Sequence, residues 1–65
     1  MNKQHAFEVF KSQGFKVEMF DDGVFVSLNR AIDKQEVFVA SHYQISDMHM
    51  MRVSDNEIAV LCPEI

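Results

Sequence analysis

Three side chains in the second half of this 65-residue chain are of types that bind metals: His42, His49 and Cys62. If the segments that carry His49 and Cys62 pair as strands, with Val53 opposite Ile58, these two side chains lie directly across from each other. Zinc usually takes four protein ligands, or three and a water molecule, so His42 would have to supply a third. The interpretation that we favour is a small buried thiol beside a hydrogen-bonded histidine. We therefore expect no metal and no cofactor, and a metal-binding protein that uses His42, His49 and Cys62 is an alternative function.

Other potentially reactive residues are also better explained by structure than by chemistry. The run Met48–Met51 contains thioether and imidazole groups, which suit Cu(I). Consecutive strand residues point to opposite faces, however, so we interpret these methionines as adaptable apolar contacts. The neighbouring Asp21 and Asp22 are typical of a solvated turn. The sequence contains no glycine-rich phosphate loop and no recognisable nucleophile motif, so we expect no enzyme.

The first half of the chain predicts a helix followed by a hairpin. Residues 3–13 place their apolar side chains on one helical face, between a capping Asn2 and a terminating glycine. Residues 15–20 and 24–28 then alternate between apolar and polar side chains. The intervening Asp22-Gly23 pair favours a two-residue type I′ turn, which would place Phe20 directly opposite Phe25.

The second half of the chain repeats this order with a second helix and a second hairpin. Asp33 and Glu36 have the spacing of a capping box, which predicts a helix over residues 34–43. Val37, Phe38 and Val39 favour a helix less strongly, so a strand over residues 36–41 remains an alternative. Residues 48–53 and 58–62 predict the second hairpin. In the register with Val53 opposite Ile58, one face carries the four residues Met50, Arg52, Ala59 and Leu61.

These elements predict a single small α+β domain over residues 1–65. Its order is α-β-β-α-β-β, with a four-stranded antiparallel sheet and two helices on one face. The alternative strand over residues 36–41 would give one helix plus five strands. A core of this size supplies only about 3–5 kcal/mol of stability, and one cysteine excludes an internal disulfide. Oligomerisation is therefore one expected source of additional stability.

An apolar second sheet face is the feature that most strongly predicts a function. The predicted registers place four apolar side chains there, and Phe38 lies on a less buried side of the second helix; the predicted interface is Phe20, Phe25, Phe38, Met50 and Leu61. Contiguous exposed apolar patches usually mark an interface. We therefore expect a non-catalytic, accessory or regulatory protein that binds other proteins, as a homodimer joined through the sheet face or an edge strand.

Composition limits the other classes of partner. The net charge is −4 and the six lysines and arginines are scattered singly, so we expect no direct binding of nucleic acid. We also expect no membrane association, since no apolar run approaches the length of a membrane span. The single cysteine and the lack of a signal-peptide pattern favour the cytoplasm.

Acidity offers an alternative function, a mimic of nucleic acid that inhibits a nucleic-acid-binding protein. This function requires five acidic residues to lie along one surface: Asp21, Asp22, Asp47, Asp55 and Glu57. Both hairpin turns are acidic, and one arrangement that would satisfy this places the two turns at one end of the sheet.

Overall fold

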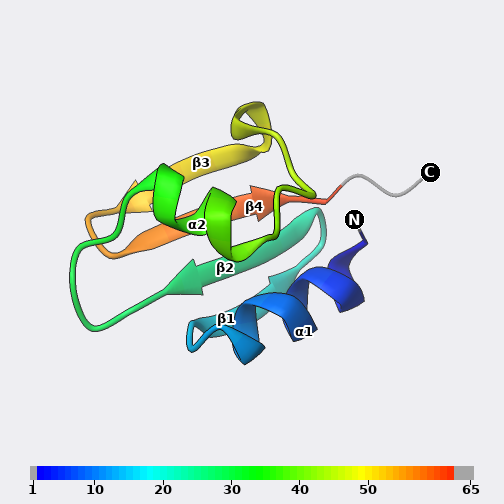
Figure 1. Cartoon of the computed structure of the whole chain (residues 1–65), viewed down its shortest axis with the longest axis horizontal. Coiled ribbons are helices and arrows are strands. Elements are labelled where there is room, and N and C mark those ends of the chain that lie inside the picture. Colours follow the sequence, from blue (N-terminus) through cyan, green and yellow to red (C-terminus); the bar gives the residue numbers. More distant parts are fainter. Residues whose placement is uncertain (1, 63–65) are drawn as a thin grey trace.

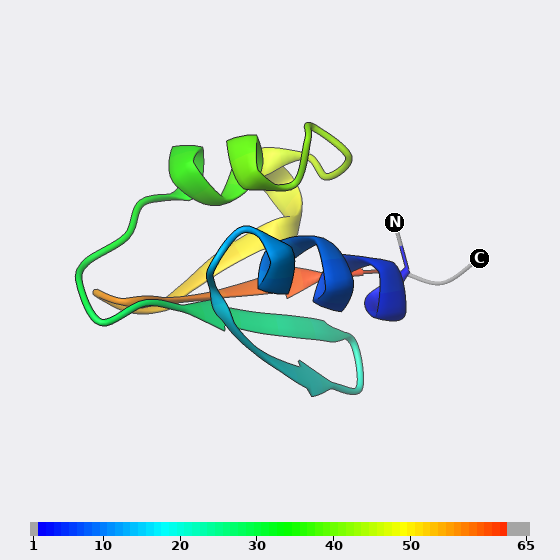
Figure 2. The ribbon, with the colours of Figure 1, turned by 60° about the horizontal axis from the view of Figure 1, so that its bottom comes forward.

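The computed structural model describes residues 2–62; Met1, residues 63–65 and the side chain of Asp47 lie outside the description. Its elements are α1 (Lys3–Ser12), β1 (Lys16–Phe20), β2 (Gly23–Ser27), α2 (Lys34–Ala40), the 3-10 turn η1 (Asp47–His49), β3 (Met50–Ser54) and β4 (Glu57–Leu61). The four strands form one antiparallel sheet in the order β1-β2-β4-β3 (Figure 1). Both helices lie on the same face of this sheet (Figure 2), so the expected α+β architecture is confirmed.

The first helix begins and ends where its sequence predicts, within one residue. The side chain of Asn2 caps it by accepting a hydrogen bond from the His5 N–H at 2.8 Å. Gly14 follows the helix with φ of +93°, a conformation that glycine adopts readily. The helix packs on β1 and β2 through Ala6 and Phe10, both fully buried.

The second helix ends three residues earlier than predicted, at Ala40. Asp33 caps its first turn, because its carboxylate accepts a hydrogen bond from the Glu36 N–H at 2.7 Å. The helix stops because His42 and Tyr43 have positive φ angles of 58° and 64°, which no α-helix contains. Residues 36–41 are therefore helical up to Ala40, and the five-stranded alternative does not occur. No helix within residues 2–62 has the length and apolar character needed to cross a membrane.

The first hairpin turns one residue earlier than predicted. Phe20 pairs with Gly23, so the turn residues are Asp21 and Asp22. Gly23 is a buried strand residue, and a Cβ atom there would lie 1.9 Å from the carbonyl oxygen of Val60 on β4. The glycine thus permits close approach of two strands. The predicted turn would instead have required positive φ at this residue. Moving the turn by one residue changes the partner of every β1 residue by two positions, from Phe25 to Gly23 in the case of Phe20. Since side chains alternate with a period of two, the predicted division of side chains between the two faces still holds.

The second hairpin contains a β-bulge that the sequence prediction missed. Close to the turn Ser54 pairs with Glu57, in the predicted register, but the register shifts between Arg52 and Ser54. Beyond the bulge Met50 lies opposite Val60, on the core face of the sheet, where it is only 2% exposed. The prediction that Met50 lines the open face is therefore wrong, because one extra residue reverses the alternation of side chains.

The core fills the space between the helices and the sheet. Its buried members come from both helices, from β2, β3 and β4, and from the segments between or after them: Ala6, Phe10, Phe15, Val24, Val26, Ile32, Val37, Ile45, Met50, Ile58, Val60 and Cys62. The rings of Phe10 and Phe15 meet edge to face, with centroids 6.0 Å apart. This contact joins helix α1 to the start of the first hairpin. Both helices of residues 2–62 lie over this core, so neither of them covers the other face of the sheet (Figure 2).

Candidate interaction surface

The sheet face away from the helices is apolar at one end and polar at the other. The pairings place Glu18, Phe25, Ala59 and Met51 in one row across the four strands. A neighbouring row runs from Phe20 past Gly23 to Leu61. The third row, near the β3–β4 turn, holds Lys16, Ser27, Glu57 and Ser54. We define the open-face cluster as the apolar residues of the first two rows: Phe20, Phe25, Met51, Ala59 and Leu61.

Stacked aromatic rings form the centre of the open-face cluster. Phe20 and Phe25 lie diagonally across β1 and β2, with ring centroids 4.4 Å apart and planes inclined by 28°. Both rings and Leu61 are half-buried, whereas Met51 is 55% exposed. None of the helices in residues 2–62 covers these side chains (Figure 2). A patch of this composition costs free energy in water, about 25 cal/mol per Å² of exposed apolar area.

Three of the five predicted interface residues belong to this cluster: Phe20, Phe25 and Leu61. Met50 is in the core, as described above. Phe38 lies on the other side of the molecule, half-buried against the core, with the Tyr43 ring 5.0 Å away in an edge-to-face arrangement. Met51 was missed because the alternation of a regular strand assigns it to the core. The methionine run contains no local signal for the bulge that turns it outward.

The candidate metal ligands His42, His49 and Cys62 do not converge. The strand pairing of β3 starts with Met50 opposite Val60, and His49 instead lies in η1, where its Nδ1 is hydrogen-bonded to Ser46 Oγ at 2.7 Å. His42 Nε2 lies 3.4 Å from the side-chain nitrogen of Gln13. Among residues 2–62, with the side chain of Asp47 left aside, no three His, Cys, Asp or Glu side chains are close enough to hold a metal ion.

Cys62 is a structural thiol in this arrangement. It is 3% exposed and its sulfur lies 3.7 Å from the carbonyl oxygen of Val60. Burial raises the pKa of the Cys62 thiol, which disfavours the thiolate that a metal ligand or a nucleophile requires.

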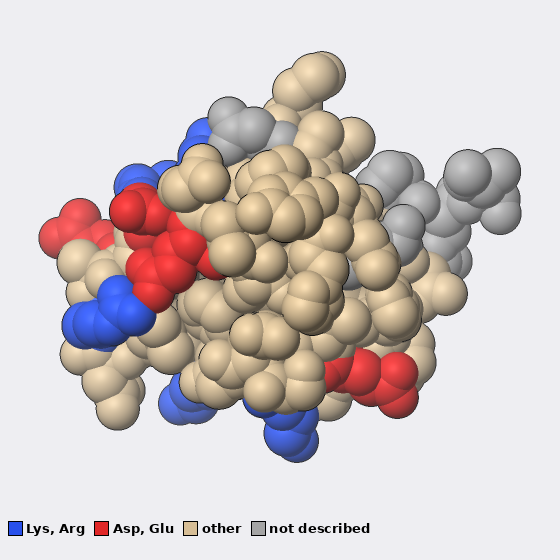
Figure 3. Space-filling view, in the orientation of Figure 1, with Lys and Arg blue, Asp and Glu red and all other residues tan. Residues whose placement is uncertain are grey.

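The acidic turns lie at opposite ends of the sheet. Gly23, which follows Asp21-Asp22, pairs with Leu61, whereas Ser27 pairs with Glu57 beside the β3–β4 turn. The arrangement with both turns at one end therefore does not occur, because β2 and β4 run antiparallel. On the helix-covered side, charged groups of both signs lie around the margin and the centre is uncharged (Figure 3). The separation of the two acidic turns does not favour a function as an acidic mimic of nucleic acid.

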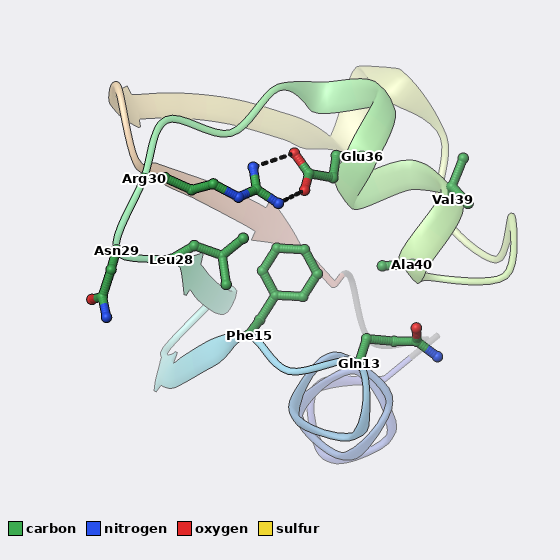
Figure 4. A pocket seen from close by; sticks show the side chains of 8 residues that line it. All are labelled: Gln13, Phe15, Leu28, Asn29, Arg30, Glu36, Val39 and Ala40. Carbon is green, nitrogen blue, oxygen red and sulfur yellow. Dashed lines mark hydrogen bonds and ion pairs between the residues drawn. The ribbon is translucent and has the colours of Figure 1, made fainter.

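A solvent-open hollow of about 670 Å³ lies between the end of α1 and α2, on the helix-covered side. Phe15 lies at its centre, between Leu28 and Ala40, and the paired side chains of Arg30 and Glu36 form one margin (Figure 4). Its volume is within the range of small-molecule sites. However, its two charged groups already neutralise each other.

The Arg30–Glu36 pair should give the fold a small pH dependence. Hydrogen bonding to Arg30 holds the pKa of the Glu36 carboxyl below its usual value. The pair therefore stabilises the fold above the carboxyl's unfolded pKa, and this contribution disappears as the pH falls through the folded pKa. We expect Glu36→Gln to lower the urea midpoint slightly at neutral pH, because both groups are exposed to solvent. The difference from the wild-type chain should vanish in acid; a difference that grows there would contradict this assignment.

Comparison of the chain with protein-family models, with curated proteins and with solved structures gives no match. The surfaces described above are therefore the basis for the functional proposal.

Proposed function

We propose that this protein is a non-catalytic protein–protein interaction module that forms homodimers through the open face of its sheet. The observation that carries the proposal is the open-face cluster, in which stacked Phe20 and Phe25 adjoin Leu61 and the exposed Met51. Aromatic residues and methionine are the types enriched at protein interfaces. A module of this kind suits an accessory or regulatory role.

The size of the face sets the expected strength of the dimer. Four strands of five residues cover roughly 14 by 17 Å, at the strand spacing and rise of an ordinary sheet. Typical stable interfaces bury about 800 Å² on each partner, which is more than such a face can offer. We therefore expect reversible association with a dissociation constant in roughly the micromolar range. A twofold axis that lies in the plane of the interface brings the two open faces together. An axis along the strands would place the apolar ends of the two copies against each other, and an axis across the strands would place each apolar end against the other copy's polar row.

Phe25→Asp is the variant that tests the open face. It places a charge at the centre of the cluster, where burial in a dimer would be costly, so we expect association to weaken at least about tenfold. Sedimentation equilibrium over about 1–500 μM would measure this change, a range chosen to bracket micromolar association. Circular dichroism would check that the variant is folded.

Two matched variants make this experiment decisive. Met51→Asp changes the same face at a side chain that is 55% exposed, so it should weaken association with little effect on folding. Val39→Asp changes an apolar residue of comparable accessibility, 45% exposed, on the helix-covered side and should leave association unchanged. Equal association of folded Phe25→Asp, Met51→Asp and wild-type chains would refute the proposal.

A further inference from the structure

The two edges of the sheet differ in how well they are protected from pairing with another strand. The edge strand β3 contains the bulge between Arg52 and Ser54, which interrupts its row of backbone groups. The other edge strand, β1, pairs with β2 residue by residue from Lys16 to Phe20 without a shift. Its Lys16, Glu18 and Met19 side chains are exposed. β1 is therefore the edge that is regular enough to accept a further strand.

The hydrogen-bond pattern identifies which backbone groups of β1 point outward. Cys62 N–H donates to the Asp22 carbonyl at 2.8 Å, and Leu28 N–H donates to the Asn56 carbonyl at 3.3 Å. The even-numbered residues of β2 thus bond to β4, and its odd-numbered residues bond to β1. The β1 partners of those odd-numbered β2 residues are Lys16, Glu18 and Phe20, whose backbone groups therefore point inward, toward β2. The backbone groups of Val17 and Met19 are consequently directed to the free edge.

We propose that β1 pairs antiparallel with β1 of a second copy, about a twofold axis at Val17. This register joins the outward backbone groups of Val17 in the two copies. It also places Met19 opposite Phe15 of the other copy. The Phe15 N–H already donates to Phe10 within the chain at 3.2 Å, which leaves about four backbone hydrogen bonds across the axis.

Charge complementarity selects this register and a second copy as the partner. Lys16 lies opposite Glu18 of the other copy, and the twofold axis repeats the pair. These are non-hydrogen-bonded positions, where facing side chains come closest. An axis at Glu18 would instead place two carboxylates face to face. The same pairing covers Met19, which is 45% exposed although it lies on the core face of the sheet.

This edge contact goes beyond the proposed function, because it uses a surface different from the open face. A chain that uses both contacts forms assemblies larger than a dimer. Met51→Asp should disable only the open face, because Met51 lies on β3, whereas Phe25→Asp would place a second carboxylate opposite Glu18 of β1. Met51→Asp therefore provides a background in which the β1 contact is measured alone.

Charge reversal in that background tests the register. Glu18→Lys and Lys16→Glu each place like charges opposite each other twice, and each should weaken association about tenfold. An equimolar mixture of these two variants restores both opposite-charge pairs, and so does the double swap K16E/E18K in a single chain. Sedimentation equilibrium should therefore show recovery of association in the mixture and in the double swap. The differences should disappear at about 1 M salt, where exposed charges are screened.

Each outcome separates the two proposals. If folded Met51→Asp is monomeric throughout, the β1 contact is overturned while the open-face proposal stands. If it associates like the wild-type chain, the open-face proposal fails and the reversal series decides the β1 contact. Failure of the mixture and the double swap to regain association overturns the register. Phe25→Ala, which removes the ring without adding a charge opposite Glu18, replaces Met51→Asp as the background if the latter does not fold.

Discussion

Gly23→Ala is expected to lower the free energy of unfolding by about 3 kcal/mol, at the upper end of the usual cost of overpacking. The added methyl group would lie 1.9 Å from the carbonyl oxygen of Val60 and 3.1 Å from the nitrogen of Cys62. Both atoms belong to the backbone, so no side-chain rotation can relieve the overlap and the central β2–β4 pairing must open. Urea denaturation followed by circular dichroism would measure the loss.

Gly14→Ala is the matched control, because it separates a lack of space from a lack of conformational freedom. Gly14 has φ of +93°, but a Cβ atom there would have no neighbour within 4 Å. Alanine at this residue should cost only the backbone strain, about 1–2 kcal/mol. If Gly23→Ala cost no more than Gly14→Ala, Gly23 would be acting as a turn residue. The Asp22-Gly23 turn expected from the sequence would then be correct.

Phe10→Ala is expected to destabilise the fold by about 3–5 kcal/mol, which matches the whole stability expected of so small a core. The Phe10 side chain is fully buried and meets Phe15 edge to face, so its removal leaves a cavity between α1 and the sheet. We therefore expect a largely unfolded chain, visible as loss of the cooperative urea transition.

Two further variants keep the Phe10 result quantitative. Phe10→Leu retains most of the volume and should cost less than about 2 kcal/mol, which leaves a measurable transition. Phe20→Ala removes a half-buried ring on the open face and should cost about 1 kcal/mol, chiefly the stacking with Phe25. An unchanged midpoint in Phe10→Ala would show that this ring does not attach α1 to the sheet.

Local signals were enough to predict the helices, the hairpins and two of the cluster's aromatic residues. Asn2 and Asp33 cap the helices that they were expected to cap, since a cap depends on atoms only three residues away. Phe20 and Phe25 lie on the open face as predicted, although the turn was misplaced. The error changes the pairing of β1 with β2 by two residues, and a change of two residues keeps each side chain on the same face. The prediction for Met50 was wrong because the bulge shifts β3 by a single residue relative to β4, which moves each side chain beyond the bulge to the other face.

The sequence by itself determined the order of elements and the amphipathic pattern of each, because capping and side-chain alternation act over a few residues. Only the tertiary structure decided how the elements face one another. The close contact of Gly23 with β4 moved the first turn, and the bulge in β3 exchanged Met50 for Met51 on the open face. The antiparallel pairing of β2 with β4 separated the acidic turns. Each of these three features depends on contacts between residues far apart in the chain, so no local sequence pattern predicts it.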